Sequence, residues 1–192
     1  MNEVTASDNF IPMIREYLFK SERLGFRNWL GSDIAIMAEI NADPDVMKFF
    51  PGTQSLEQTE AFIERMQLQM SKKGYCYFAV DKLMDGEFIG FVGLSEQTFE
   101  ASFTPCIDIG WRLSKMEWNK GYATEGAKRC LDYAFNQLEI QKVNAMAPKI
   151  NLRSIQVMEK IGMKKPTGFV HPLLVDDERL KECVLYEIAK EF

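Results

Sequence analysis

The residues best suited to chemistry lie in a short glycine-containing turn, Ser114 to Thr124, which precedes an amphipathic stretch. A helix that starts there has unpaired backbone N–H groups in its first turn and the positive end of its dipole, so the turn can hold an anion. Gly121 would let a phosphate approach the backbone closely. The chemistry expected at this turn is therefore phosphate binding by main-chain N–H groups.

Two different periods flank the turn and predict the elements that position it. Before it, Ile107, Ile109, Trp111 and Leu113 alternate with smaller or polar residues, which is typical of a strand over Cys106 to Leu113. After it, apolar residues recur at helical spacing through Gln137. These residues are Ala127, Cys130, Leu131, Ala134, Phe135 and Leu138. The sequence thus predicts a strand, an anion-binding turn and a helix in succession.

The turn matches neither of two better-known phosphate-binding loops. No G-x-G-x-x-G occurs in the chain, which excludes the dinucleotide fingerprint. Gly121 and Gly126 have Walker-type spacing, but Ala127 and Lys128 follow in place of Lys and Ser or Thr. By itself the turn is equally compatible with an ordinary strand-to-helix connection that contains a glycine.

A family resemblance breaks this tie. Trp118 to Glu125, WNKGYATE, resembles the pyrophosphate-binding loop of the GNAT acyltransferases, in the W-x-x-G-x-A-T-E form of the branch that includes the ribosomal-protein N-terminal acetyltransferases. The likeness extends from about Ser21 to Lys190, in the family's order. Its further matches are Ser21 to Arg27 (first strand), Asp43 to Met47 (first helical region), Asn151 to Ser154 and Glu159 to Met163 (closing motif).

The resemblance implies an α/β (α+β) class and the GNAT fold, a mixed and mainly antiparallel central sheet of about six to seven strands with helices on both faces. We expect residues 21–192 to form one acetyltransferase domain and residues 1–20 an N-terminal extension of uncertain structure. The expected partners are acetyl-CoA as cosubstrate and an amine acceptor.

The resemblance also implies how acetyl-CoA is held. Backbone N–H groups of about Asn119 to Thr124 would bind the pyrophosphate, and Ile109 to Leu113 would pair with the pantetheine arm like an added strand. Asn151 matches an asparagine that contacts the pantetheine, and it equally suits a helix N-cap. The cofactor-binding residues implied in this way are Ile109, Trp111, Arg112, Leu113, Trp118, Asn119, Lys120, Gly121, Tyr122, Ala123, Thr124, Asn151 and Ser154.

Two residues are the expected catalytic groups. Ser154 matches the serine that this branch uses near the thiol, where it could hydrogen-bond the departing sulfur. Many family members use a tyrosine instead, at the position that is Met158 here, and methionine cannot donate a proton. Asp108 occupies the place of a glutamate often seen on this strand and is the candidate general base. Either it or the alternative carboxylate, Glu96, would also suit a solvated strand face or the attraction of a cationic acceptor.

The acceptor side is less defined by the sequence. In the family the loop between the first two helices, here Met47 to Thr53, walls the acceptor site. Phe49 and Phe50 are therefore substrate-binding candidates, although two adjacent aromatic residues also suit core packing. Glu96 and His171 complete the candidates, His171 being a further possible base.

Two classes of function remain open from the sequence. The first is an acetyl-CoA-dependent N-acetyltransferase in which a primary amine, either a protein N-terminus or a small amine, attacks the thioester directly in a ternary complex. The second is a non-catalytic CoA-binding sensor or interaction module on the same fold. Met158 does not favour the second class, because the branch that the chain resembles works without the tyrosine.

Bulk properties narrow the alternatives. The 192 residues carry a net charge of −5 and no basic run longer than two lysines, so no nucleic-acid partner is expected. No membrane span or signal peptide is predicted, which leads us to expect a cytoplasmic protein. The four cysteines show no C-x-x-C pair and there is one histidine, so no metal site is expected. A monomer and a homodimer are both compatible with the sequence.

The remaining elements follow from caps and periods. The capping box at Ser55 to Gln58 predicts a helix, and Asp85-Gly86 predicts a hairpin turn. Residues 164–182 are expected to be mostly loop, with one helical turn at Asp176 to Leu180. Strands are expected near Leu24, over Tyr75 to Val80, Glu87 to Leu94, Lys142 to Ala147 and Val184 to Ile188, and further helices after Ser32-Asp33 and from Asn151 to Ile161.

Overall fold

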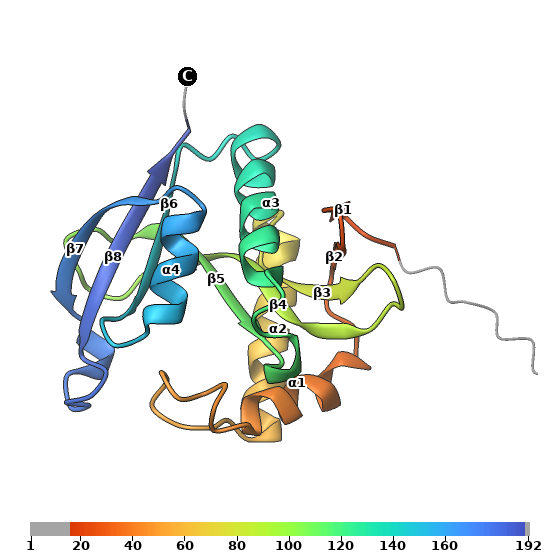
Figure 1. Cartoon of the computed structure of the whole chain (residues 1–192), viewed down its shortest axis with the longest axis horizontal. Helices are drawn as coiled ribbons and strands as arrows, with labels where there is room; N and C mark the ends of the chain where they lie inside the picture. The colour runs from red at the N-terminus through yellow and green to blue at the C-terminus, as the bar shows by residue number, and fades with distance from the viewer. Residues whose placement is uncertain (1–15, 191–192) are drawn as a thin grey trace, which may run out of the picture.

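A computed structural model describes residues 16–190 as a mixed sheet with helices on both faces (Figure 1). The sheet has eight strands in the order β1-β2-β3-β4-β5-β6-β8-β7, slightly more than the six to seven expected. The strands are β1 (Phe19–Lys20), β2 (Leu24–Arg27), β3 (Tyr77–Lys82), β4 (Phe88–Gln97), β5 (Cys106–Leu113), β6 (Lys142–Pro148), β7 (Lys164–Val170) and β8 (Glu182–Ala189). The helices are α1 (Asp33–Ala42), α2 (Leu56–Lys73), α3 (Tyr122–Asn136) and α4 (Leu152–Lys160), with 3₁₀ turns η1 (Lys115–Glu117) and η2 (Pro172–Leu174).

The strand pairing of the sheet changes from antiparallel to parallel between β5 and β6. All other neighbouring strands are antiparallel, whereas β5 and β6 run parallel and share the single register pair Asp108↔Asn144. In Figure 1 these two strands separate toward their C-terminal ends. Within residues 16–190, the second half of β5 therefore has a strand partner only on its β4 side. Its other edge keeps main-chain groups free for a further strand-like partner.

The two faces of the sheet are covered by different helices. Phe91 of β4 packs against Phe62 of α2, with ring centroids 5.2 Å apart. The next residue, Val92, faces α3, where its carbonyl oxygen lies 3.8 Å from the Sγ of Cys130. Because successive strand residues point to opposite faces, α2 and α3 lie on opposite sides of the sheet. The predicted arrangement of helices on both faces is confirmed.

The elements around the central turn agree with the sequence. β5 covers the predicted strand, and α3 begins at Tyr122 with Gly121 as its N-cap in the left-handed region, at φ 85°. The predicted capping box at α2 is present, with Ser55 accepting from the Gln58 N–H and Gln58 reciprocating. At α4 the Asn151 side chain accepts from the Ser154 N–H, as the predicted cap requires.

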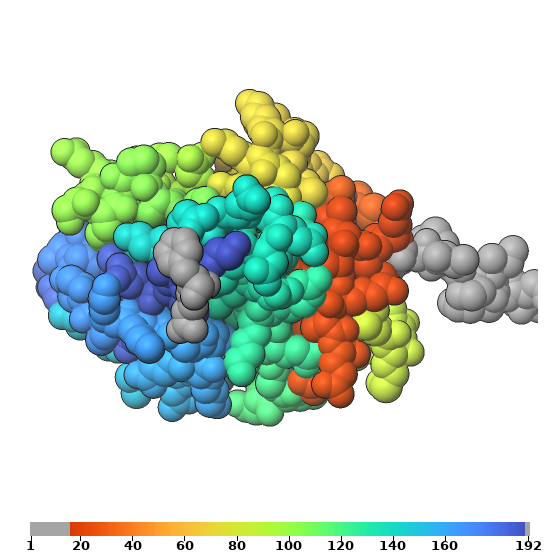
Figure 2. Space-filling view, turned by 90° about the horizontal axis from the view of Figure 1, so that it is seen from above, coloured from red at the N-terminus to blue at the C-terminus, as the bar shows by residue number. Residues whose placement is uncertain are grey.

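Residues 164–182 differ from the prediction. They begin with a strand, β7, so the predicted loop was wrong over Lys164–Val170, and a 3₁₀ turn follows at Pro172–Leu174. Within the predicted turn at Asp176 to Leu180, the N–H groups of Leu180 and Lys181 donate to the Asp177 carbonyl oxygen. Pro166 and Gly168 disfavour a strand, but β7 is the edge strand, and Pro166 sits where its register with β8 shifts. Figure 2 shows the β4–β5 loop (green) beside these C-terminal strands (blue), and Phe103 packs edge-on against Phe169 at 5.0 Å.

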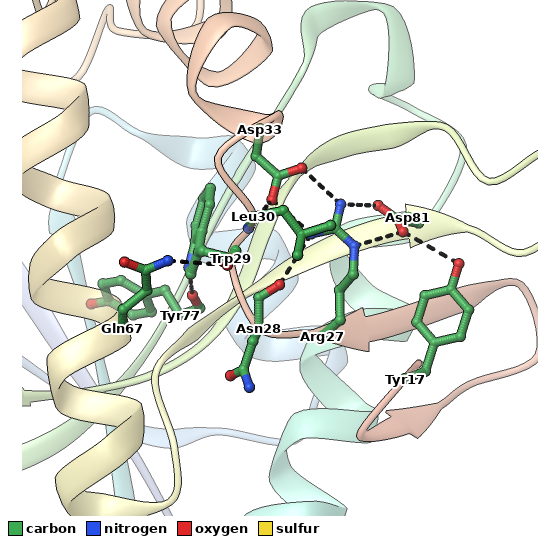
Figure 3. A network of polar contacts seen from close by, with 9 residues as sticks. All are labelled: Tyr17, Arg27, Asn28, Trp29, Leu30, Asp33, Gln67, Tyr77 and Asp81. Atoms are coloured by element: carbon green, nitrogen blue, oxygen red, sulfur yellow. Dashed lines mark hydrogen bonds and ion pairs between the residues drawn. The ribbon is translucent and has the colours of Figure 1, made fainter. Parts of the chain in front are cut away.

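The N-terminal strands are tied to the rest of the sheet by apolar and ionic contacts. Phe19 of β1, which the sequence placed in the N-terminal extension, stacks on Phe26 and on Tyr133 of α3. The buried Arg27 of β2 pairs with Asp33 of α1 at 2.6 Å and Asp81 of β3 at 2.7 Å (Figure 3). Residues 1–15 of the predicted N-terminal extension lie outside the described residues.

Candidate active site

The turn between β5 and α3 presents a row of main-chain N–H groups. Asn119 and Gly121 both have positive φ, at 61° and 85°, which turns the chain sharply into α3. Within residues 16–190, none of the N–H groups from Asn119 to Thr124 donates to a protein acceptor, and the first helical bond of α3 is Glu125 N–H to the Gly121 oxygen at 3.0 Å. The sequence prediction of an anion-binding turn therefore has the geometry that it needs.

Side chains on both sides fix the conformation of this turn. The indole N–H of Trp118 donates to the carbonyl oxygen of Leu113 at 3.0 Å, which closes the turn on the end of β5. The guanidinium of Arg23 donates to the carbonyl oxygen of Lys120 at 3.1 Å. In a trans peptide the carbonyl and the next N–H point in opposite directions, so the Gly121 N–H faces away from Arg23. That direction is the side on which an anion can approach.

Glu125 anchors the first turn of α3 to the β1–β2 turn. Its carboxylate accepts from the Ser21 hydroxyl at 2.7 Å and from the Arg23 backbone N–H at 2.8 Å and Nε at 2.6 Å. Burial raises the pKa of Glu125, but these hydrogen bonds and the positive charge of Arg23 outweigh burial, and the net shift is downward. The carboxylate is therefore ionised at neutral pH and ties the first turn of α3 to the β1–β2 turn.

The N-terminus of α4 comes close to the same turn. The guanidinium of Arg153 lies over the Trp118 ring, 5.0 Å from its centroid. Asn151 and Ser154 belong to the same first turn of α4, with Asn151 Oδ1 accepting from the Ser154 N–H at 3.3 Å. Two segments that the sequence predicted to bind one cofactor, the turn after β5 and the start of α4, are thus brought together.

Asp108 lies buried on β5 where the sheet opens. Its carboxylate accepts from the Tyr77 hydroxyl at 2.8 Å and from Gln97 Nε2 at 2.9 Å. Burial raises the pKa of Asp108 to about 6, although both hydrogen bonds act in the opposite direction. A carboxylate with such a pKa is largely ionised at neutral pH and can still accept a proton.

Gly110 and Arg112 share the face of β5 with Asp108. A side chain at Gly110 would meet the Tyr77 ring, since a Cβ there would lie 3.0 Å from it. The guanidinium of Arg112 lies beneath the Phe50 ring, 4.2 Å from its centroid, and donates to Asn41 Oδ1 at 2.6 Å. Ile109 and Leu113 alternate with these residues and are buried on the α3 side.

The sequence model of the acetyltransferase (GNAT) domain family matches residues 23–164, which span the turn and both flanking elements. The chain belongs to the GNAT acetyltransferases. Its assignment to the ribosomal-protein N-terminal acetyltransferase branch stays a prediction.

Individual relatives agree with this family. Bacillus subtilis YkkB, an uncharacterized protein, is 38% identical over 124 residues, covering 63% of this chain and 69% of its own. The uncharacterized N-acetyltransferase YnaD of the same bacterium is 28% identical over 172 residues, covering 89% and 96%. The curated relatives thus match this chain over most of their length.

Solved structures show the same fold. A GNAT-family acetyltransferase from Bacillus anthracis superposes with a TM-score of 0.74 at 27% identity, covering 88% of this chain and 96% of its own. A spermidine N-acetyltransferase from Vibrio cholerae, in complex with CoA and spermine, superposes with a TM-score of 0.69 at 19% identity, covering 87% and 95%. The second likeness concerns the fold alone.

Two other predicted residues of this acetyltransferase lie in separate surroundings. Glu96 is exposed and pairs with Lys73 of α2 at 3.4 Å. It lines a hollow of about 380 Å³ with Asn144, whose buried Oδ1 accepts no hydrogen bond from the described residues. His171 caps η2 through its Nδ1 and packs 4.5 Å from the Phe99 ring, and burial lowers its pKa. No described contact joins Glu96 or His171 to Asp108, and their proposed roles in acceptor binding stay predictions.

The loop between α1 and α2 meets the loop between β7 and β8. The guanidinium of Arg179 donates to the carbonyl oxygens of Lys48 and Phe50. A hollow of about 540 Å³ at this junction is lined by Pro51, Leu173, Leu174 and residues 176–179. Phe50 turns its ring toward Arg112, whereas Phe49 lies under the ammonium of Lys48, 5.8 Å from its ring centroid. Of the two predicted phenylalanines, Phe50 is therefore the one with a described contact to the face of β5 that carries Asp108.

Sequence reasoning missed several residues of this site. Tyr77 and Gln97 hold Asp108, but they lie on β3 and β4 and carry no motif of their own. Arg23 lies within a segment matched to the first strand, where nothing in the sequence shows that it reaches Lys120. In the described part of the chain, no group of three or more His, Cys, Asp or Glu residues is placed to hold a metal ion. No helix in residues 16–190 is long and apolar enough to span a bilayer.

Proposed function

We propose that the protein transfers the acetyl group of acetyl-CoA to a primary amine by direct attack in a ternary complex. The observation that carries the proposal is the run of N–H groups from Asn119 to Thr124 at the start of α3, which donate to no acceptor among the described residues. Such a run offers several donors and the positive end of a helix dipole to one anionic group, and a pyrophosphate fits that description. Coenzyme A supplies that group together with the thioester.

The free edge of β5 is the proposed site of the pantetheine arm. Ile109 to Leu113 lie beyond the register pair Asp108↔Asn144, where β6 no longer pairs with β5. Main-chain groups there can bond the amides of the arm in the manner of an added strand. Asn151 is placed at the N-terminus of α4, where its cap and a contact with the arm are compatible.

The proposed chemistry forms one C–N bond and breaks one C–S bond. The neutral amine attacks the thioester carbonyl carbon, a main-chain N–H of β5 stabilises the oxyanion, and the C–S bond breaks as the thiolate leaves. Asp108 accepts the proton that the ammonium group must lose, directly or through one water, and Tyr77 orients its carboxylate. The second proton, which the attacking nitrogen loses as the amide forms, passes to the thiolate sulfur. No covalent enzyme intermediate is needed.

Ser154 is the proposed partner of the departing sulfur. It lies in the first turn of α4 and is half-buried, and its hydroxyl donates to no acceptor among the described residues. Met158, at the place of the tyrosine of many relatives, is 2% exposed and packs in the core. A free thiol has a pKa of about 8.5, so protonation of the thiolate needs only modest help.

Two measurements test this function. Calorimetric titration with acetyl-CoA should show binding, and thiol release should accompany incubation with acetyl-CoA and a mixed pool of amines and peptides. Absence of binding at millimolar acetyl-CoA would refute the proposal. Binding without thiol release in the presence of any amine would favour the non-catalytic sensor instead.

A further inference from the structure

Arg112 is a buried cation without a carboxylate partner. The residue is 9% exposed, and within residues 16–190 no Asp or Glu forms an ion pair with it. Its Nη1 donates to the neutral oxygens of Asn41 at 2.6 Å and Gln54 at 3.3 Å. Burial lowers the pKa of Arg112 to about 10, so the guanidinium stays positively charged at neutral pH.

The other deeply buried arginine shows what a structural site looks like in this protein. Arg27 is 3% exposed, and its guanidinium is shared between the carboxylates of Asp33 and Asp81 (Figure 3). Burial alone would lower the pKa of Arg27, but the hydrogen bonds and charges of the two carboxylates outweigh it and the pKa rises. A buried charge is costly unless it is paired, so Arg112 calls for a different explanation.

One edge of the Arg112 guanidinium is free. Its Nε is buried and has no acceptor, and its Nη2 donates to no described residue. These two nitrogens carry parallel N–H bonds on the same edge, because the guanidinium is planar. That edge is the one that a carboxylate engages through two parallel hydrogen bonds. The unpaired charge and the unpaired donors thus point to the same type of ligand.

The free edge lies on the acceptor side of the sheet. Arg112 shares its face of β5 with Asp108, because both alternate with the buried Ile109 and Leu113 of the α3 side. The Phe50 ring of the α1–α2 loop lies above the guanidinium. The turn that we assign to the CoA phosphates belongs to α3, on the opposite face. A phosphate held at Asn119 to Thr124 therefore does not satisfy Arg112.

We propose that Arg112 binds a carboxylate of the acceptor, so that the enzyme acetylates amines that carry an acidic group at a distance, such as ω-amino acids and short peptides. This inference rests on the proposed function and names its substrate class. The amine would lie toward Asp108 and the carboxylate toward Arg112. Because the two Cα positions are about 13 Å apart along an extended strand, the test acceptors need a range of spacer lengths.

The first test compares acceptors that differ only in this charge. Dipeptides and ω-amino acids are assayed for thiol release beside their C-terminal amides. The native enzyme should show a kcat/KM for the acids that is roughly 10- to 100-fold higher, the size of a charge-assisted hydrogen-bond pair. Arg112→Gln should remove that preference, and Arg112→Lys should keep part of it. The exposed Arg65, which also lies over a phenylalanine ring, gives the control Arg65→Gln.

Acetyl-CoA affinity separates this site from the cofactor site. Arg112→Gln should weaken acetyl-CoA binding far less than Gly121→Val does, since the contact proposed for residue 112 with the pantetheine arm uses main-chain groups and its side chain faces away from the phosphate turn. Equal turnover of acids and amides by the native enzyme would overturn the inference while leaving the proposed function intact. An acid preference that survives Arg112→Gln would overturn it as well.

Two further measurements test the carboxylate site without requiring acetyl transfer. N-acetylated dipeptides should bind the CoA complex more tightly as acids than as amides, and Arg112→Gln should abolish the difference. If no amine is acetylated yet this difference is found, the proposed function fails and the carboxylate site stands. Arg112→Met should lower the Tm less than Arg27→Met does, because it loses the hydrogen bonds to Asn41 and Gln54 but no ion pair. A loss of Tm as large as that of Arg27→Met would show that Arg112 is structural and would overturn the inference.

Discussion

Arg23 and Glu125, which are 102 positions apart in the sequence, form a bond of 2.6 Å that joins the β1–β2 turn to the first turn of α3. The same guanidinium donates to the Lys120 carbonyl and lies over the Tyr122 ring, 4.6 Å from its centroid. One arginine therefore restrains both sides of Gly121. Since the N–H groups of this turn must converge on one anion, the restraint prepares the turn for binding.

Arg23→Met should weaken acetyl-CoA binding about fivefold, because the turn loses the restraint that holds its N–H groups in place. Folding should change little, because an exposed ion pair contributes about 1 kcal/mol to stability at most. Calorimetry with acetyl-CoA measures the affinity, and thermal unfolding measures the stability. Lys142→Met removes another surface ion pair, with Glu187, and serves as the control. Unchanged affinity in Arg23→Met would show that the turn holds its conformation without this restraint.

Gly121→Val should weaken acetyl-CoA binding by more than about tenfold. The residue has φ 85°, which costs a β-branched side chain about 1–3 kcal/mol, and the strain falls on the N–H groups that bind. Gly121→Asn should be milder, because asparagine tolerates this conformation. Gly31→Val is the matched control, since Gly31 has ordinary φ and open space around it. Equal affinity in Gly121→Val and Gly31→Val would place the phosphates elsewhere.

The strand, turn and helix at the centre of this fold could be predicted from local sequence patterns. Features that depend on contacts between distant segments could not. Short sequence patterns predict three features of the fold: the alternation in β5, the glycine before α3 and the N-cap at Asn151. β7 has no such signal, because an exposed edge strand with a proline and a glycine forms only when β8 is there to pair with it. The contacts of Tyr77 and Arg112 come from several elements far apart in the sequence, so their roles could not be inferred from sequence spacing.

Asn151 should reveal two separable roles. Asn151→Ala removes the N-cap of α4 and should cost about 1 kcal/mol of folding free energy together with acetyl-CoA affinity. Asn151→Ser keeps a capping oxygen on a shorter side chain, so it should restore the stability while the affinity stays reduced. Urea unfolding and calorimetry on the two variants measure these quantities separately. If Asn151→Ser recovers both, the residue acts on the cofactor only through the helix.

Asp108 should cause kcat/KM to fall at acidic pH. Since burial raises its pKa to about 6, protonation below that pH removes the proposed base. With an amine acceptor, log kcat/KM should fall with a slope of about 1 as the pH drops below 6. Ionisation of the acceptor amine adds its own pH dependence at higher pH, and Asp108→Asn separates the two. This variant should lose activity and the step near pH 6, and a step that persists in it would assign the base to another group.

The same buried carboxylate should reduce stability as it ionises. Its pKa is about 6 in the folded protein and about 3.9 in an unfolded chain, so the folded state prefers the protonated form. The contribution of Asp108 to the free energy of unfolding is fully present below about pH 4. It is lost as the pH rises through 6, by roughly 3 kcal/mol in all. Asparagine imitates the neutral acid, so Asp108→Asn should be more stable than the native protein at pH 8. Urea unfolding at pH 8 and pH 5 should show this advantage shrinking at the lower pH. An advantage that grows on acidification would mean that Tyr77 and Gln97 stabilise the carboxylate more than burial destabilises it, and the base would then titrate below its ordinary range.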